Sequence, residues 1–285
     1  MSELDGRRIA KDIRAKVAAD AAEYRSRGIV PTLAIVLATE DESARWYVRS
    51  LMKAAENCGV ASQTVELPAG ATTAEIAAAL RKLAADPSVH GVILQTPLPD
   101  GVVSEELIEL VPPAKDVDGI NPLTAGRLQA GEPAFAPATA EAVMVLLDAH
   151  DVPVAGRHAV IVGRSRVVGK PVSGLLLARD ATVTTCHSRS GDLSMYTRQA
   201  DILVVAAGKP GLVTPEMVSE QAVVIDVGTN VVDGELVGDV AEAVAAHAAG
   251  LTPVPGGVGP VTTALILQHV LTSVSTSLRA QQTLQ

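Results

Sequence analysis

Short apolar runs that alternate with helical segments are the feature that most constrains the fold of this 285-residue chain. Residues 4–27 place apolar side chains at intervals of four, which is typical of one helical face. Residues 32–38 form a short β-branched run, which is typical of a buried strand, and helical composition returns at 43–57. Strands that alternate with helices predict a parallel sheet with helices on its faces, so the expected fold class is α/β.

The alternation falls into two series. The first continues with a strand at 61–66, a helix at 73–85 opened by a Thr-Thr-Ala-Glu capping box, and a strand at 91–94. Residues 112–137 are rich in Pro, Gly, Asp and Asn and show little periodicity, which predicts a connection between two domains. The second series is expected to contain strands at 159–162, 182–186, 202–206 and 223–227, a helix at 168–178 and a final helix at 261–278.

Composition excludes several classes of protein. The net charge of −9, with no long run of Lys or Arg, argues against binding to nucleic acid or anionic membranes and favours a small-molecule partner. Cys58 and Cys186 lie far apart in the chain and are predicted to be buried thiols, and no spacing of metal ligands predicts a metal site. The N-terminus is charged from its start and no long apolar stretch follows, so we expect a cytosolic protein.

The turn after the strand at 159–162 is a candidate nucleotide site. Gly163, Ser165 and Gly169 lie at a strand-to-helix turn, where backbone N–H groups can hold a phosphate. Ser165 stands where the G-x-G-x-x-G fingerprint has its second glycine, so this turn alone is equally compatible with an ordinary loop. The next strand leads into Ser188 and Arg189 rather than the acid that binds the ribose of NAD, which favours NADP. A solvated surface residue is the alternative interpretation of Arg189.

Four further segments carry candidate site residues. The loops at 206–211 and 226–230 follow apolar strands and are expected at the same carboxyl edge of a sheet. Gln95 ends a strand before a two-proline turn, where it either binds a ligand or caps nearby backbone. Asp116 and Asp118 form a carboxylate pair suited to acid–base chemistry, although Asp-Gly is first of all a turn signal. The stiff Pro- and Gly-rich loop at 252–260 favours ligand binding.

Taken together, these segments resemble the methylenetetrahydrofolate dehydrogenase/cyclohydrolase (FolD) family, in order and over nearly the whole chain. The resembling stretches are SARWYVRSLMKAAENCGV, GVILQTPLP, KDVDGINP, GRSRVVGKPVSGLLL, ATVTTCHS, ADILVVAAGKPG, VVIDVGTN, LVGDV and TPVPGGVGPVTTALI. The resemblance implies a folate-binding catalytic domain at 1–136, completed by a C-terminal helix at 262–285, and a Rossmann-type NADP domain at 137–261. It also implies an active site in the cleft between the domains, and a homodimer.

The resemblance further implies an enzyme that oxidises 5,10-methylenetetrahydrofolate with NADP and then hydrolyses the methenyl product to 10-formyltetrahydrofolate. By position, Tyr47 would stack on the folate, while Gln95 and Asp118 would bind or polarise the pterin and its reacting bridge. The loop residues that would border the folate are Pro255, Gly256 and Gly257. Together with Arg189 and Gly208 from the loops above, the residues expected at the NADP are Gly163, Arg164, Ser165, Ser188 and Thr229.

One departure from the family pattern concerns the chemistry directly. The family has a lysine one turn after the tyrosine, used in the cyclohydrolase step, and Leu51 occupies that position. A leucine can neither donate a proton nor activate water. Lys53 and Arg49 point elsewhere around the helix, so neither is an obvious substitute. Smaller departures are PATA at 137–140 where the family has PCTP, Thr229 in place of Ile, and DGINP in place of DGFHP.

We therefore expect a methylenetetrahydrofolate dehydrogenase whose cyclohydrolase activity is weak or absent, because hydride transfer chiefly needs the reactants to be held in near-attack geometry. The alternative is a repurposed transferase that passes the one-carbon unit to another nucleophile, with Leu51 shielding the electrophile from water. A catalytically inactive folate-binding scaffold is the third possibility, and retention of Tyr47, Gln95 and Asp118 disfavours it.

Overall fold

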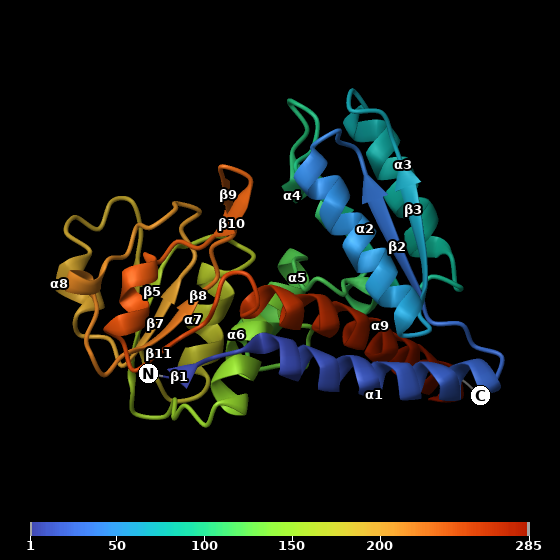
Figure 1. The fold of residues 1–285 in the computed structure, drawn as a ribbon. Coiled ribbons are helices and arrows are strands. Elements are labelled where there is room, and N and C mark those ends of the chain that lie inside the picture. Colours follow the sequence, from blue (N-terminus) through green and yellow to red (C-terminus); the bar gives the residue numbers. More distant parts are fainter. Residues whose placement is uncertain (1, 284–285) are drawn as a thin grey trace. The chain divides into compact units, whose positions relative to one another are not determined.

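The computed structural model describes residues 2–283, and by internal contacts the chain divides into two compact units. Unit 1 comprises Met1–Lys11 and Pro137–Thr262, and unit 2 comprises Asp12–Ala136 and Thr263–Gln285. Two long helices, α1 (Gly6–Ser26) and α9 (Val258–Thr283), each begin in unit 1 and continue into unit 2 (Figure 1). Both units are α/β, so the expected fold class is confirmed.

Unit 2 is built on a three-stranded parallel sheet in the order β3-β2-β4. The strands β2 (Thr32–Leu37) and β4 (Gly91–Gln95) are largely buried, as their apolar sequences predict, whereas β3 (Ala61–Glu66), which has a more polar sequence, is partly exposed. The helical elements of this unit are α2 (Glu42–Asn57), α3 (Thr73–Ala85), α4 (Ser104–Ile108), η1 (Pro113–Lys115) and α5 (Pro122–Gln129).

Unit 1 contains a six-stranded sheet in the order β1-β11-β8-β7-β5-β6, in which every neighbouring pair is parallel. Its strands are β1 (Ser2–Glu3), β5 (His158–Val162), β6 (Thr182–Cys186), β7 (Ile202–Val205), β8 (Val223–Asp226) and β11 (Gly250–Leu251). Its helical elements are α6 (Ala138–Ala149), α7 (Gly169–Leu177), α8 (Ser194–Thr197), η2 (Pro215–Met217) and η3 (Glu242–Ala246). A separate antiparallel hairpin is formed by β9 (Asn230–Val232) and β10 (Glu235–Val237).

Local sequence signals account for the starts of two helices in unit 2. Asp41 precedes α2 and accepts a hydrogen bond from the N–H of Ala44 at 2.8 Å. Thr72 and Glu75 form the expected capping box at α3, each side chain accepting a hydrogen bond from the backbone N–H of the other residue. Each cap satisfies N–H groups that the first helical turn leaves without partners.

The N-terminal residues differ from the expected domain division. We expected residues 1–136 to form one domain, but residues 1–11 group with residues 137–262. The reason is strand pairing, because β1 pairs with β11 and the N–H of Leu4 donates to the carbonyl of Leu251 at 3.0 Å. The exact bounds of the functional domains otherwise stay a prediction.

Helix α9 is apolar along most of its length. Among the described residues it is the one helix that by length and composition could cross a membrane, over Val258–Ala280. Of its apolar 18-residue stretch, 61% is buried inside the structure, and the core helix of a globular protein has the same length and composition. Cys58 and Cys186 are both buried and free, as expected.

Candidate functional site

Four parallel strands of unit 1 end in one row. Cys186 of β6, Val162 of β5, Val205 of β7 and Asp226 of β8 are paired in register across the sheet. The loops that follow these strands therefore begin side by side at the carboxyl edge, where open α/β sheets bind ligands. This arrangement brings together the loops that contain the predicted cofactor residues Gly163, Arg164, Ser165, Ser188, Arg189, Gly208 and Thr229.

Gly163 lies where two of these loops approach each other most closely. It has a φ of +129°, and a Cβ atom at this position would lie 2.1 Å from the carbonyl oxygen of Ala206. Only glycine fits both the backbone conformation and the space. The contact joins the ends of β5 and β7, at the point in the sheet where the strand order reverses and nucleotides bind.

The residue at the second fingerprint position is bonded to the helix that follows it. The Ser165 hydroxyl accepts hydrogen bonds from the N–H groups of Val168 and Gly169, at 3.2 and 3.4 Å, at the start of α7. Ser165 therefore organises the turn from within, which a glycine could not do. Arg164, Ser188, Arg189 and Thr229 are exposed, so their side chains are accessible to a ligand.

Asp239 holds one of these loops, and sequence reasoning gave it no role. Its carboxylate is fully buried and accepts hydrogen bonds from the N–H groups of Ala207, Gly208 and Lys209 at 2.6, 2.8 and 2.8 Å. The side chain of Asn230 adds a further hydrogen bond at 2.9 Å. The loop after β7 is therefore wrapped around a buried anion, and the stretch LVGDV was the available signal.

Asp226 makes a second buried carboxylate beside the first. It accepts hydrogen bonds from the N–H groups of Gly228, Asp239 and Val240 at 2.9 to 3.0 Å. Burial raises the pKa of Asp226 to about 6 against the opposing effect of these bonds, and the charge of Asp239 raises it further. The two carboxylates fix the loop after β8 relative to the loop after β7.

In unit 2, Tyr47 and Asp118 lie close enough to interact electrostatically. Burial, and to a smaller extent the charge of Asp118, raises the pKa of the Tyr47 hydroxyl, so this group stays neutral and able to donate. Burial and the charge of Asp116 raise the pKa of Asp118 to about 6, while His269 lowers it. A carboxyl group that titrates near neutral pH is suited to exchange a proton with a ligand.

The two aspartates of the predicted pair have different surroundings. Asp116 is buried and its carboxylate accepts hydrogen bonds from the N–H groups of Ile120 and Asn121 at 3.1 and 2.9 Å, so it closes the turn. Asp118 is partly exposed and makes no hydrogen bond through its carboxylate to any residue between 2 and 283. The turn that Asp118-Gly119 predicts is present, since the N–H of Gly119 donates to the carbonyl of Asp116 at 2.9 Å, and the carboxylate of Asp118 nevertheless stays available.

His269 is a neighbour of Asp118 that sequence reasoning missed. It lies on α9 and is 5% exposed, and its Nδ1–H donates to the carbonyl oxygen of Val117 at 2.7 Å. Its ring stacks at a tilt on Phe135, with 4.8 Å between the centroids. No local pattern signals this residue, because its partners lie more than 130 positions away in the sequence.

Leu51 is 1% exposed and is one of the largest fully buried side chains of the chain. Arg49 and Lys53 line a pocket that neither Tyr47 nor Leu51 lines, so neither cation takes the place of a lysine at position 51. Gln95 ends β4 in register with Leu37, and its amide donates to the carbonyl of Thr96 at 2.6 Å. That contact is the backbone cap given above as the alternative to ligand binding, and it leaves the amide oxygen of Gln95 uncommitted among the described residues.

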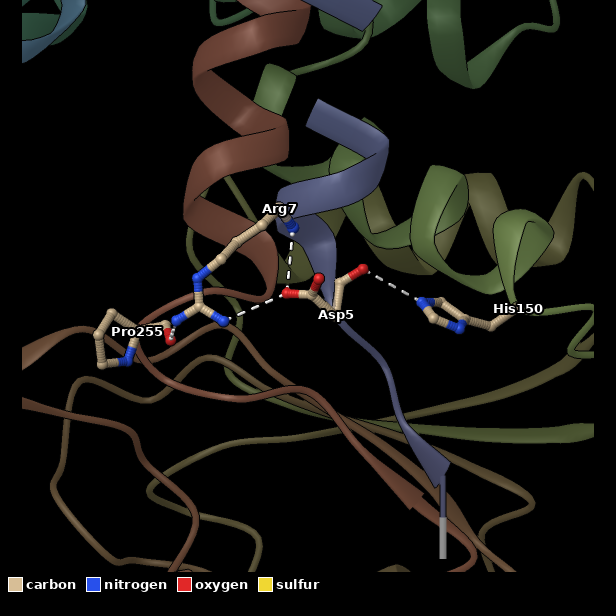
Figure 2. A network of polar contacts seen from close by, with 4 residues as sticks. All are labelled: Asp5, Arg7, His150 and Pro255. Carbon is tan, nitrogen blue, oxygen red and sulfur yellow. Dashed lines mark hydrogen bonds and ion pairs between the residues drawn. The ribbon is translucent and has the colours of Figure 1, made fainter. Parts of the chain in front are cut away.

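The loop with Pro255, Gly256 and Gly257 belongs to unit 1, where the start of α1 holds it (Figure 2). Arg7 donates from Nη2 to the carbonyl of Pro255 at 2.7 Å and pairs through Nη1 with Asp5 at 3.3 Å. Gly256 has a φ of +126°, and a Cβ atom there would lie 2.3 Å from the guanidinium carbon of Arg7. A glycine at this position therefore lets the guanidinium lie against the loop.

Comparisons with known proteins identify the family of the chain. Residues 4–118 match the family model described as the tetrahydrofolate dehydrogenase/cyclohydrolase catalytic domain, and residues 137–278 match its NAD(P)-binding domain. The chain is 59% identical over 276 residues to bifunctional protein FolD 1 of Saccharopolyspora erythraea, which covers 96% of this chain and 94% of that protein.

Two solved structures are similar over almost their full length. The bifunctional FolD of Campylobacter jejuni has a TM-score of 0.95 and 40% identity, covering 97% of this chain and 99% of that one. The Trypanosoma brucei FolD, solved in complex with NADP cofactor and an inhibitor, has a TM-score of 0.93 and 38% identity, with 98% of each chain covered. The chain therefore belongs to the tetrahydrofolate dehydrogenase/cyclohydrolase family.

Proposed function

We propose that this protein oxidises 5,10-methylenetetrahydrofolate to 5,10-methenyltetrahydrofolate with NADP, and that the hydrolysis to 10-formyltetrahydrofolate is weak or lost. The observation that carries the second part is Leu51, which is buried and apolar where the resemblance places the cyclohydrolase lysine. Family membership and the NADP complex of the T. brucei relative support the first part.

The residues at the carboxyl edge of unit 1 fit a dinucleotide. Gly163 lets the loops after β5 and β7 approach each other at the strand-order reversal, where a Cβ atom would clash with the carbonyl oxygen of Ala206, and the exposed Arg189 after β6 suits a 2′-phosphate. When bound there, NADP would supply the acceptor for the hydride, with its two electrons, that leaves the methylene carbon. The chain's own part in this is to hold the loops of that edge rigid, through Gly163, Asp226 and Asp239.

On the folate side, the proposal assigns orientation rather than covalent chemistry to the protein. Tyr47 offers a flat ring on which the pterin can stack, and its hydroxyl is neutral. Asp118 offers an uncommitted carboxylate that can hydrogen-bond to the pterin. The amide oxygen of Gln95 accepts from a ligand donor, and Pro255, Gly256 and Gly257 would border the folate. Holding the reacting carbon in place supplies much of the rate of such a transfer.

Leu51 bears on the second step because hydrolysis needs a group that moves a proton to or from water. A buried leucine has no such group and also excludes water from its surroundings. The apolar side chain of Leu51 would also favour the alternative of a one-carbon transferase, since it would protect an electrophilic folate from water. The two possibilities differ in whether NADP is reduced.

The test is a paired assay on the purified protein. Reduction of NADP and of NAD by methylenetetrahydrofolate is measured, and the decay of methenyltetrahydrofolate is measured separately against its spontaneous rate. We expect NADP reduction with little enzymatic hydrolysis. Folate binding with neither reaction would refute the dehydrogenase and favour the transferase.

Leu51→Lys completes the test, with Leu51→Met as a control of similar volume and no charge. General acid–base catalysis contributes on the order of 10²-fold or more, so we expect Leu51→Lys to raise hydrolysis at least ~10-fold after allowing for the lowered pKa of a buried amine. Equal hydrolysis by the wild type and Leu51→Lys would contradict the role given to this position.

We also propose a homodimer. The hairpin of β9 and β10 exposes Val231, Val232 and Leu236, an apolar surface that a second copy would cover. Light scattering of the wild type and of Val231→Asp tests this, since a charge on the hairpin should dissociate the dimer. A cytosolic location stays a prediction.

A further inference from the structure

The pocket lined by Arg49 and Lys53 lies on α2, beside the last turn of α1 and the start of the strand β3. Its volume is about 740 Å³, within the range of sites that bind small molecules. Arg25 from α1 also lines it, and Met52 and Val60 give it an apolar part. All of these residues belong to unit 2.

The charge of this pocket is opposite to that of the chain. Arg25, Arg49 and Lys53 face one acidic side chain, Glu56, in a protein whose net charge is −9. Arg49 and Lys53 are four residues apart on α2, a spacing at which like charges repel by a few tenths of a kcal/mol. The helix dipole favours cations only in the last turn, and Arg49 lies two turns before the end of α2. The cluster is therefore not explained by stability.

The protein itself does little to neutralise these cations. Arg25 donates from Nε to the carbonyl of Gly59 at 2.7 Å, which anchors the guanidinium and leaves both Nη groups without a partner among residues 2–283. Arg49 is 3.8 Å from Glu42, and both side chains are exposed, so this ion pair is weak. Lys53 makes no ion pair or side-chain hydrogen bond with any described residue.

An exposed aromatic side chain continues the same face of α2. Trp46 is the single tryptophan of the chain and is 59% exposed. It precedes Arg49 by three residues and Lys53 by seven, so at about 100° per residue Trp46 and Lys53 lie within roughly 20° of each other around the helix. The indole of Trp46 lies outside the lining of the pocket, on the same face of α2, and offers an exposed surface on which a flat ring can stack.

We propose that this pocket binds an aromatic phosphate ester of mononucleotide size. Arg25, Arg49 and Lys53 would hold the phosphate, since guanidinium groups match phosphate oxygens in pairs and an ammonium adds a compact charge. Trp46 would stack on the aromatic ring where the ligand extends past Arg49 and out of the pocket, while Met52 and Val60 form the apolar part of the pocket itself. The hydroxyl of Ser62, on β3 at the pocket wall, has no hydrogen bond to another described residue and accepts or donates to the ligand.

AMP is the probe, and calorimetry is carried out on protein saturated with NADP, so that the nucleotide site proposed for unit 1 is already filled. We expect one AMP per chain, with adenosine and inorganic phosphate each binding more weakly than AMP. The double variant Arg49→Gln/Lys53→Gln should weaken AMP binding at least ~10-fold, because it removes two charged phosphate contacts.

The matched control is Arg81→Gln/Lys82→Gln, which makes the same change of charge at exposed positions on α3. This control should bind AMP as the wild type does. Equal weakening by the two double variants would mean that only overall charge matters, and would overturn the proposal. The altered side chains are exposed, so both variants should fold, and thermal unfolding by circular dichroism checks this.

The indole N–H of Trp46 gives a second measurement on the unaltered protein. Because the chain has one tryptophan, it gives one indole resonance in a nitrogen–proton spectrum. We expect this resonance to shift on addition of AMP with NADP present. No shift and no heat up to about 10 mM AMP, a concentration at which even millimolar affinity is visible, would overturn the proposal. NADP reduction is assayed separately, so failure here leaves the proposed function standing.

Discussion

Replacing Asp239 by asparagine should loosen the loop after β7, because the Asp239 carboxylate accepts hydrogen bonds from three backbone N–H groups of this loop. Oδ2 accepts from the N–H groups of Ala207 and Gly208, and Oδ1 accepts from Lys209 and Asn230. An asparagine keeps one acceptor oxygen and turns its NH₂ group toward two donors in either orientation. Two hydrogen bonds to a charged acceptor are therefore lost, at ~1.5–3 kcal/mol each.

Part of this loss of free energy is offset, because the variant no longer buries a second carboxylate next to Asp226. We expect the loop to open more easily by a net ~2–4 kcal/mol, which corresponds to roughly 30-fold or faster hydrogen exchange at the backbone N–H groups of Ala207, Gly208 and Lys209. The KM for NADP should rise while the KM for methylenetetrahydrofolate changes little. Exchange within about 3-fold of the wild type would refute the reasoning.

Asp233→Asn is the control for this experiment. Asp233 is an exposed aspartate in the same unit, so the variant makes the same chemical change without removing a buried acceptor. Its loop exchange should match that of the wild type. Hydrogen exchange at the wild-type rate in Asp233→Asn, together with faster exchange in Asp239→Asn, would assign the effect to the buried carboxylate.

Three further predictions concern other parts of the chain. Since the pKa of Asp118 is raised to about 6, the folded protein binds the proton of the Asp118 carboxyl more tightly than the unfolded chain does. The stability that this carboxyl contributes is therefore present at about pH 4 and is lost as the pH rises through 6. Urea unfolding should show a decline of ~2 kcal/mol over this range that Asp118→Asn lacks, and parallel curves for the two proteins would contradict it. Arg7→Ala removes the hydrogen bond to Pro255, which is worth ~1 kcal/mol at this exposed position. The KM for methylenetetrahydrofolate should rise several-fold in this variant and recover in part in Arg7→Lys. An unchanged KM would exclude a role of Arg7 in holding the loop. Thr72→Ala removes one side of the capping box and should lower the free energy of unfolding by ~1 kcal/mol, whereas Thr72→Ser, which keeps the hydroxyl, should not.

The elements that local sequence predicts well are those with a local cause. The strands β2 and β5 are short apolar runs, and α3 begins at a capping box, so each is found within one or two residues of its expected position. Helix α6 was missed because it is buried on most sides and therefore lacks an amphipathic period. The hairpin of β9 and β10 did carry a signal, Asp233-Gly234, that is typical of a tight turn.

The residues of the candidate site also divide into those that a local sequence signal indicates and those that depend on distant partners. Tyr47 and Asp118 are candidates from motifs and their role at the folate stays a prediction, to which the structure adds that the charge of Asp118 helps to raise the pKa of Tyr47. For Asp239 the stretch LVGDV was the one local signal, but it does not reveal the carboxylate's partners, which lie 9 to 32 positions away. His269 has no local signal, and Val117 lies 152 positions from it. The pairing of β1 with β11, two strands of two residues each, is equally invisible in the sequence.

The path of the chain has a consequence for its synthesis. Unit 2 includes residues from 263 onward, and there His269 and Ser273 donate hydrogen bonds to the carbonyls of Val117 and Ala114. These bonds cannot form until the last segment has left the ribosome, although residues 12–136 are made long before it. Unit 1 in turn must keep the first residues, up to Lys11, until residues 250–251 arrive to pair with them. Neither unit can be finished while the other is still being translated, so the usual order of domain-by-domain folding from the N-terminus does not apply to this chain.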